Sequence, residues 1–414
     1  MLTADMTRRQ FLAAAAAAPW LANYHAMAAV ETGRHKIRSL DVMVIQGPDR
    51  NYTHVRVNTD TGLHGIGEGY GSPGAGVKEQ MLALEPLLVG KDPLEIEKIY
   101  VGLSRHTDGS AHMFLRGVSG IEMALWDLAG KILNVPVTTL LGGAYRDKVR
   151  MYNHGAPSNY LDKSACREWA AERREDKRGF NCVKFSPERT TPETDIAHDP
   201  ANRVLTNTEL RNIRQGFENC REALGWEHDI IVHCHWEYDL RTAIQLADAI
   251  EPMMPLYLED PLPVEYNESW RRLCDASRVA IGMGENKARR QGFEPWIVNG
   301  AIDVLNPDLR NTGGLLETKK IADMADVYYI PFYNHNTGAT VCTMATIQWA
   351  AAIRDYIACE TVVNRYPFME ELLVLDEPIF QDGFIKLPNK PGLGIEINPD
   401  VAKAHLAEGE VWWG

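Results

Sequence analysis

After Lys148 the sequence repeats one pattern eight times: a short apolar run that ends in polar or charged residues. Amphipathic stretches at helical spacing, such as LRTAIQLADAIEP, separate the runs. One strand followed by one helix is a βα unit, and eight such units close into a (β/α)8 barrel. The carboxyl ends of barrel strands meet at one mouth, so the sequence predicts that the residues ending the runs converge there. These residues are His154, Lys184, His233, Glu259, Glu285, Asp308, His335 and Glu360.

The interval between Lys184 and His233 is 49 residues, longer than any other interval in the series. It contains SPERTTPETDIAHDPANRVLTN, a polar stretch that exceeds the usual length of a barrel loop. We interpret it as a lid beside the mouth, with a surface insertion as the alternative.

The segment from Lys36 to about Ala144 has a different organisation. IRSLDVMVIQ and THVRVNTDTGLHGIGEGY alternate like strands joined by turns, and Asp60-Thr61-Gly62 marks one turn. VKEQMLALEPLLVG and GVSGIEMALWDLAGKILNVPVTTLLGG then have helical spacing. This part of the chain is predicted to form a small α+β domain.

The first 28 residues have the features of an export signal. Arg8 and Arg9 precede an apolar stretch from Phe11 to Ala18, and Ala26-Met27-Ala28 follows as a cleavage site. This order resembles a twin-arginine signal, so we expect a periplasmic protein whose fold excludes about residues 1–28. The alternative is a frayed alanine-rich helix. No later span is long and apolar enough to cross a membrane.

Charge and cysteine content narrow the function. The formal net charge is −13 and the pI is near 5.5, which argues against a nucleic-acid surface. An acidic substrate is still allowed, because a metal or local cations can reverse the field inside a pocket. The seven cysteines form no CxxC pair and are expected to be reduced, buried thiols.

The stretch DIIVHCHWEYD ends an apolar run with two histidines. In an extended strand, His233 and His235 would face one side. A group at position 233, with Glu259 and Glu285, would come from three consecutive strands and could hold a divalent cation against substrate oxygens.

Candidate proton-transfer groups flank these residues. Lys184 and His235 lie on one side in the predicted barrel, and Asp308 and His335 on the other. This layout suits removal of a proton next to a carboxylate, with the cation stabilising the resulting enediolate.

The sequence resembles the enolase superfamily, specifically the mandelate racemase and sugar-acid dehydratase group that includes galactonate and mannonate dehydratases. The resemblance covers nearly the whole chain after the signal. It implies a cap, residues 29–145, whose loops around 47–52 and 70–76 set substrate choice, over a barrel, residues 146–365. It also implies that residues 366–414 return to pack on the cap. The stretches that carry it are VRVNTDTGLHGIGEG, GIEMALWDLAGKILNVPVTTLLGG, VKFS, YLEDPLP, MGEN, NPDLRNTGG, FYNHN, ACE and NKPGLGIEI.

The resemblance also implies roles for site residues. Glu259 and Glu285 match two magnesium ligands, and Asp308 with His335 matches an acid/base dyad. Glu360 matches a residue that contacts the substrate carboxylate or the developing enediolate. Lys184 matches the first lysine of a KxK pair.

Two positions depart from the family pattern. Ser186 replaces the second lysine, and a serine is not a base unaided; His235 resembles a base that can substitute for it. His233 stands where the family has an aspartate ligand. As a ligand it would shift metal preference from Mg²⁺ toward Mn²⁺, Fe²⁺ or Zn²⁺; the alternative is a core histidine. The predicted substrate contacts are His154, Ser186 and Asn334, with a plain hydrogen-bonded histidine as the alternative at position 154.

These interpretations converge on a metal-dependent sugar-acid dehydratase that binds a small acid sugar. A racemase or epimerase and a lactone cycloisomerase are alternatives from the same superfamily. A non-catalytic exported sugar-acid binding protein is the alternative from another class, and His233 is the feature that favours it. We expect no nucleic-acid or membrane partner once the signal is removed, and the resemblance implies a homo-oligomer.

Overall fold

The computed structural model describes residues 19–71, 76–105, 111–187 and 201–413, and its larger part is a closed barrel. Eight parallel strands follow one another around it in chain order, and the pairing of β11 with β4 closes the ring. The predicted barrel is confirmed. The strands are β4 (Lys148–His154), β5 (Cys182–Phe185), β6 (Asp229–His233), β7 (Leu258–Glu259), β8 (Ile281–Met283), β9 (Val304–Leu305), β10 (Phe332–Asn334) and β11 (Tyr356–Thr361).

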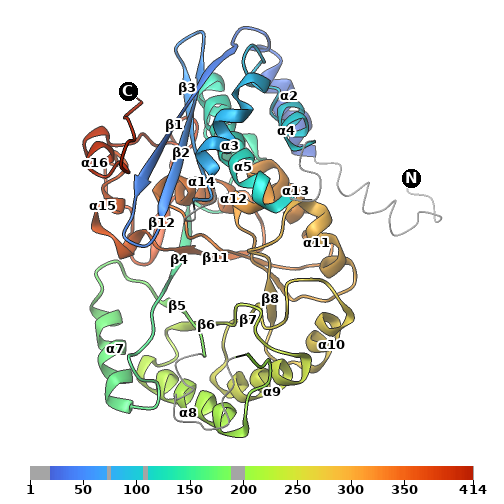
Figure 1. The fold of residues 1–414 in the computed structure, drawn as a ribbon, viewed down its shortest axis with the longest axis vertical. Helices are drawn as coiled ribbons and strands as arrows, with labels where there is room; N and C mark the ends of the chain where they lie inside the picture. The colour runs from blue at the N-terminus through green and yellow to red at the C-terminus, as the bar shows by residue number, and fades with distance from the viewer. Residues whose placement is uncertain (1–18, 72–75, 106–110, 188–200, 414) are drawn as a thin grey trace, which may run out of the picture.

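Helices connect successive strands and lie outside the barrel (Figure 1). Their apolar faces pack on the strands, as expected for βα units. They are α7 (Lys163–Glu175), α8 (Asn207–Leu224), α9 (Leu240–Ile250), α10 (Glu268–Ala276), α11 (Arg289–Val298), the short α12 (Leu309–Thr312), α13 (Leu315–Asp326) and α14 (Thr340–Ala351).

A buried layer of side chains fills the barrel interior. It takes residues from most strands and includes three tyrosines whose rings contact one another. Tyr152 and Tyr257 direct their hydroxyl groups toward the polar residues of the mouth. This layer forms the floor of the site. Its members are Tyr152, Cys182, Ile231, Tyr257, Val304, Tyr333 and Ala358.

The cap combines an antiparallel sheet with helices, as predicted. A glycine repeat explains how strand and helix pack: a Cβ at Gly65 or Gly67 would lie 2.1 Å from a backbone oxygen of α5. Only glycine allows this close approach. The cap elements are β1 (Ile37–Gln46), β2 (Asn51–Thr59), β3 (His64–Gly69), α3 (Val77–Leu84), α4 (Ile96–Ser104), α5 (Ala111–Leu133) and α6 (Val137–Leu140).

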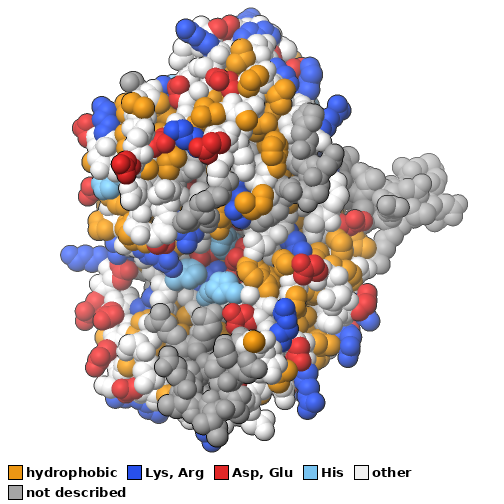
Figure 2. All heavy atoms as spheres, viewed as in Figure 1, with side chains coloured by type: hydrophobic (Ala, Val, Ile, Leu, Met, Phe, Trp, Pro, Cys, Tyr) orange, Lys and Arg blue, Asp and Glu red, His pale blue; other side chains and the backbone are white. Residues whose placement is uncertain are grey.

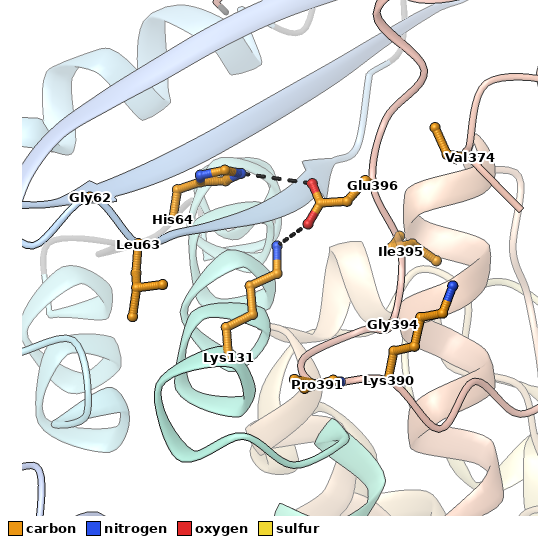
Figure 3. A pocket seen from close by; sticks show the side chains of 10 residues that line it. All are labelled: Gly62, Leu63, His64, Lys131, Val374, Lys390, Pro391, Gly394, Ile395 and Glu396. Carbon is orange, nitrogen blue, oxygen red and sulfur yellow. Dashed lines mark ion pairs between the residues drawn. The ribbon is translucent and has the colours of Figure 1, made fainter.

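The C-terminal segment lies beside the cap sheet (Figure 1). It contains α15 (Pro367–Glu370), β12 (Phe384–Lys386) and α16 (Pro399–Ala404), and the segment beyond α16 pairs with β1 through Ile45 and Leu406. Lys131 of α5 pairs with Glu396 of the C-terminal segment at 2.9 Å (Figure 3). It also lies 3.0 Å from Asp127 of its own helix. These contacts join both ends of the chain into one cap.

The N-terminal part differs from the expectation at residues 19–28. These residues form α2 (Pro19–Ala28), whose Trp20 and Tyr24 are buried. The Tyr24 ring lies 5.1 Å from that of Trp126, and its hydroxyl donates to Leu94 O at 2.6 Å. Because two aromatic side chains four residues apart share one helical face, this segment packs on the cap and is not outside the fold.

Three sequence predictions lie outside the described residues, wholly or in part. They are the arginine pair with its apolar run, most of the predicted lid (residues 188–200), and part of the cap loop around 70–76. Within the described part of the chain, no helix has the length and apolar character needed to span a bilayer.

Candidate active site

The polar residues of the site form a second layer above the barrel floor. Along a strand every second residue faces the same side. His154, His233 and Glu360 each lie two positions beyond a floor residue of their own strand. Glu259, which ends β7, and His335, which follows β10, lie two positions beyond the floor residues Tyr257 and Tyr333. The strand ends therefore converge on one mouth, and histidine side chains gather between the cap and the barrel helices (Figure 2).

Lys184 is a buried cation at the centre of this layer. Its Nζ lies 2.9 Å from Glu259 Oε1 and 3.1 Å from Glu360 Oε2, and its side chain is 1% exposed. Burial alone would lower the pKa of Lys184, but these two carboxylates raise it above its usual value. An amine held as a cation cannot accept a proton. In this arrangement Lys184 offsets the charge of two buried carboxylates.

Glu360 is buried and surrounded by donors. Besides Lys184 it contacts His154 Nε2, and the backbone N–H of Asn336 donates to Oε2 at 3.3 Å. Burial would raise the pKa of Glu360, but Lys184 and His154 hold it well below its usual range. It is therefore a fixed anion, and His154, predicted as a substrate contact, is its partner.

Asp308 and His335 form the predicted dyad. His335 Nδ1 lies 2.8 Å from Asp308 Oδ2, and its Nε2 lies 3.5 Å from Glu285 Oε2. Burial would lower the pKa of His335, but Glu285, Glu360 and Asp308 raise it to about 10. Asp308 orients the ring through Nδ1, so Nε2 faces the site.

Arg310 completes the dyad, and the sequence prediction missed it. Its Nε and Nη2 donate to the two oxygens of Asp308, at 3.1 and 2.6 Å. Burial would raise the pKa of Asp308, but Arg310 and His335 hold it below its usual range. The spacing Asp-Leu-Arg in NPDLRNTGG was the available signal, because α12 begins there and turns both side chains together.

A cluster of carboxylates lies on neighbouring strand ends. One oxygen each from Glu259, Asp260 and Glu285 lies within 4.8 Å of the others. Carboxylate oxygens at this spacing, two from buried residues and one from the partly buried Glu285, fit a hard divalent cation such as Mg²⁺. The group contains Asp260, which the sequence prediction missed, and among the described side chains it does not include His233.

The backbone explains why Asp260 joins the cluster. In a regular strand it would face away from Glu259. Its φ is 49°, in the left-handed region, so the chain turns directly after β7. Burial, with Glu285 and Glu259 nearby, raises the pKa of Asp260 well above its usual value. A bound cation would reduce the repulsion among these three carboxylates.

The expected extended strand through His235 is wrong in detail. β6 ends at His233, and His235 has a φ of 48°. A turn held by Trp236 N and Asp260 O, at 2.7 Å, nevertheless brings the two imidazoles together, with ring centroids 4.3 Å apart. His233 is buried, and His235 is exposed at the mouth. Burial and the nearby Lys184 hold the pKa of His233 well below its usual value, so its ring is neutral.

The two remaining predicted substrate contacts have backbone neighbours. Ser186 follows β5, and its carbonyl accepts from Tyr160 Oη at 3.0 Å. Asn334 is buried, and its amide donates to Pro307 O at 2.7 Å. Asn334 lies between Tyr333 of the floor and His335, so its side chain faces away from the interior.

Comparison with known proteins agrees with this architecture. Residues 28–142 match the mandelate racemase / muconate lactonizing enzyme N-terminal domain, and residues 166–401 match the enolase C-terminal domain-like family. D-xylonate dehydratase of Haloferax volcanii is 36% identical over 385 residues, covering 91% of this chain and 92% of that protein. D-galactonate dehydratase of Xanthomonas campestris pv. campestris is 30% identical over 364 residues, covering 84% of this chain and 89% of that protein.

A solved structure is similar over the same extent. The mandelate racemase/muconate lactonizing enzyme-like protein from Rubrobacter xylanophilus superposes with a TM-score of 0.84 at 31% identity, covering 92% of this chain and 99% of that one. The chain belongs to the enolase superfamily, with both domains of its mandelate racemase / muconate lactonizing enzyme branch. It is an enzyme of the hydro-lyase class, which sets aside the non-catalytic alternative.

Proposed function

We propose that the protein is a metal-dependent sugar-acid dehydratase that converts an aldonate into a 2-keto-3-deoxy acid. One observation carries the proposal. The imidazoles of His235 and His335 follow β6 and β10, four strands apart in a ring of eight, and the carboxylates at the ends of β7 and β8 come between them in strand order. A substrate bound between them has a proton-transfer group on each side. The dehydratase relatives support the same reaction.

His235 and His335 carry the proton transfers in this proposal. His235, exposed at the mouth, removes the proton from C2, and the bonding electrons move into the carboxylate to give an enediolate. His335 Nε2 then gives its proton to the departing C3 hydroxyl, which leaves as water. Asp308 holds the His335 ring with Nε2 toward the site at both stages.

The remaining charges fix the anionic substrate. Lys184 holds Glu259 and Glu360 in place and offsets their charge. Glu259 and Glu285, with Asp260 as a third oxygen donor, would hold a divalent cation, which would supply positive charge to stabilise the enediolate. His233, paired in register with Glu259, is the nitrogen donor that the sequence predicts for the same cation.

Epimerisation at C2 is a second activity beside dehydration, and the same pair of imidazoles favours it. A base on each side of C2 can remove the proton from one face and return it from the other. Loss of the C3 hydroxyl distinguishes the two reactions, because only dehydration lowers the substrate mass by that of water.

We also propose export through the twin-arginine route and assembly into a homo-oligomer. Arg8, Arg9 and the Ala26-Met27-Ala28 triplet support export. Cleavage there would remove α2, so this helix must leave the cap before the signal is cut. Sequencing the N-terminus of periplasmic protein tests the proposal, which predicts a start at Ala29 and fails if Met1 is retained.

The experiment that tests the reaction is mass spectrometry of a panel of aldonates and aldarates incubated with the protein and Mg²⁺ or Mn²⁺. Loss of water from one member, dependent on the metal, is the expected result. Folded, metal-loaded protein that changes no member contradicts the proposal. A product of unchanged mass but altered C2 configuration favours the epimerase.

A further inference from the structure

A carboxylate of the cap binds the start of a barrel helix that follows the dyad. Glu68, on β3, is fully buried, and it accepts from the backbone N–H groups of Ala339 and Cys342, at 2.7 and 2.9 Å. These residues begin α14, directly after the loop that contains His335. A carboxylate suits this position, because the first amides of a helix lack partners within it and carry partial positive charge.

A second cap carboxylate makes the same contact one unit earlier. Glu122, on α5, is buried, and its two oxygens accept from the N–H groups of Leu315 and Leu316, at 2.7 and 2.9 Å. These residues begin α13, which follows the loop from Asp308. The cap thus binds the two helices that follow the dyad strands β9 and β10.

These helix starts have no cap of their own. The residues that precede α13 and α14, Gly314 and Ala339, make no side-chain hydrogen bond to their helix. The first turn of α11 receives Glu317 from α13, a contact within the barrel. The other long barrel helices have a capping side chain from their own sequence, which is Asp162 for α7, Thr206 for α8, Asp239 for α9 and Asn267 for α10.

Glycines make room for both carboxylates. A Cβ at Gly314 would lie 1.9 Å from Glu122 Oε2, and one at Gly338 would lie 2.9 Å from Glu68 Oε1. Gly314 also has a φ of 95°, which side chains rarely adopt. Both loops are therefore shaped to admit a group from the cap.

Arg310 continues the contact to the dyad. Its Nη1 lies 3.8 Å from Glu68 Oε1, and its Nη2 donates to Asp308 and to Thr337 Oγ1 at 2.6 and 3.1 Å. Glu68, Arg310, Asp308 and His335 form an unbroken series of buried polar contacts from cap to imidazole.

We propose that Glu68 and Glu122 are positioning residues, through which the cap fixes the dyad loops, residues 308–314 and 335–339, in their catalytic arrangement. The inference rests on the proposed function for its catalytic consequence. The helix that follows β6 is different, because an amide group of its first turn is bound by its own N-terminal residue, Asp239, and not by the cap domain. The contact with the cap therefore fixes the position of His335, the proton donor in the proposed reaction, more than that of His235.

Glu68→Gln and Glu122→Gln test the proposal, since an amide keeps the shape but can accept through one oxygen only. Asp127→Asn is the matched control. Asp127 is a buried carboxylate of α5 that also accepts two backbone amides, from Ile66 and Leu393, but neither belongs to the dyad loops. Hydrogen-deuterium exchange of the metal-loaded protein gives the first readout, and steady-state kinetics the second.

We expect faster amide exchange at residues 339–342 in Glu68→Gln and at 315–316 in Glu122→Gln. We also expect kcat to fall about 10- to 100-fold, because small displacements of a catalytic group have effects of that size. KM should change less than about threefold, since the other substrate contacts are kept. Deuterium exchanged into C2 per dehydration should rise in both variants, because His235 still works. Asp127→Asn should keep kcat within about twofold.

Unchanged exchange at these amides overturns the proposal, and so does an equal loss of kcat in Asp127→Asn. Glu68→Asp, which keeps the carboxyl group on a shorter side chain, is used with the same outcomes if Glu68→Gln does not fold. If wild type dehydrates no sugar acid, the proposed function fails. The amide exchange then decides alone: loss of protection confined to residues 315–316 and 339–342 supports the contact, and unchanged protection there overturns it.

Discussion

Replacement of Lys184 by methionine tests whether one buried cation holds the site together. Methionine keeps much of the volume and removes the charge between Glu259 and Glu360. The two carboxylates are 1% and 0% exposed, so water cannot take the place of the ammonium. Removing one partner of a buried ion pair typically costs about 3–5 kcal/mol.

The surroundings place the expected value at the lower end of that range. Glu259 keeps the Tyr257 hydroxyl at 3.1 Å, and Glu360 keeps His154 and the Asn336 amide. We therefore expect Lys184→Met to lower the free energy of unfolding of metal-free protein by about 3 kcal/mol. Urea denaturation in the presence of a chelator measures it.

Lys98→Met is the control for this measurement. Lys98 pairs with Glu95 at 2.9 Å, but the two side chains are 75% and 39% exposed. Pairs of this kind contribute about 1 kcal/mol or less. Mg²⁺ stabilises every variant that binds it, but it should narrow the deficit relative to wild type only in Lys184→Met, since a cation at Glu259 replaces the lost charge. Equal losses in the two variants, unaffected by Mg²⁺, would refute the reasoning.

Three further predictions follow from the site and the cap. Nearby carboxylates raise the pKa of His335 to about 10 in metal-free protein, above its ordinary value of about 6.5. The stability that protonated His335 contributes is therefore complete below pH 6.5 and is lost as pH rises through 10. Thermal unfolding with chelator should show this as a difference in Tm between wild type and His335→Gln that shrinks across that range. Glu285→Gln should reduce turnover by at least about a thousandfold and weaken Mg²⁺ binding in calorimetry, because it removes one of the anionic oxygens around the cation; unchanged Mg²⁺ affinity would contradict its assignment. Deletion of residues 1–28 should lower the free energy of unfolding by about 3 kcal/mol or more, since the buried rings of Trp20 and Tyr24 are lost; an unchanged midpoint would show that α2 is dispensable.

The architecture was predictable because local patterns encode it. Apolar runs at regular intervals define βα units, and barrel closure then forces their carboxyl ends to one mouth. His335 and Asp308 could be paired in this way, since consecutive strands bring consecutive chain ends together. The same logic placed Glu259 beside Glu285.

The parts that the sequence did not reveal depend on backbone turns and distant contacts. Asp260 and His235 have positive φ values, so the alternation of side chains along a regular strand does not predict where they point. Glu68 contacts α14 across 271 positions of the chain, so no local spacing indicates it. Trp20 and Tyr24 sit in a segment whose composition resembles an export signal, and their spacing was the overlooked sign of a packed helix.

The central claim is that His235 removes the C2 proton while His335 delivers the proton that expels the C3 hydroxyl. The most direct measurement is NMR in D₂O of the aldonate that wild type dehydrates, following C2 proton loss and product formation in His235→Asn and His335→Asn. The account predicts that His335→Asn still exchanges the C2 proton but forms little product, and that His235→Asn does neither. Product formation by His235→Asn at the wild-type rate would contradict it.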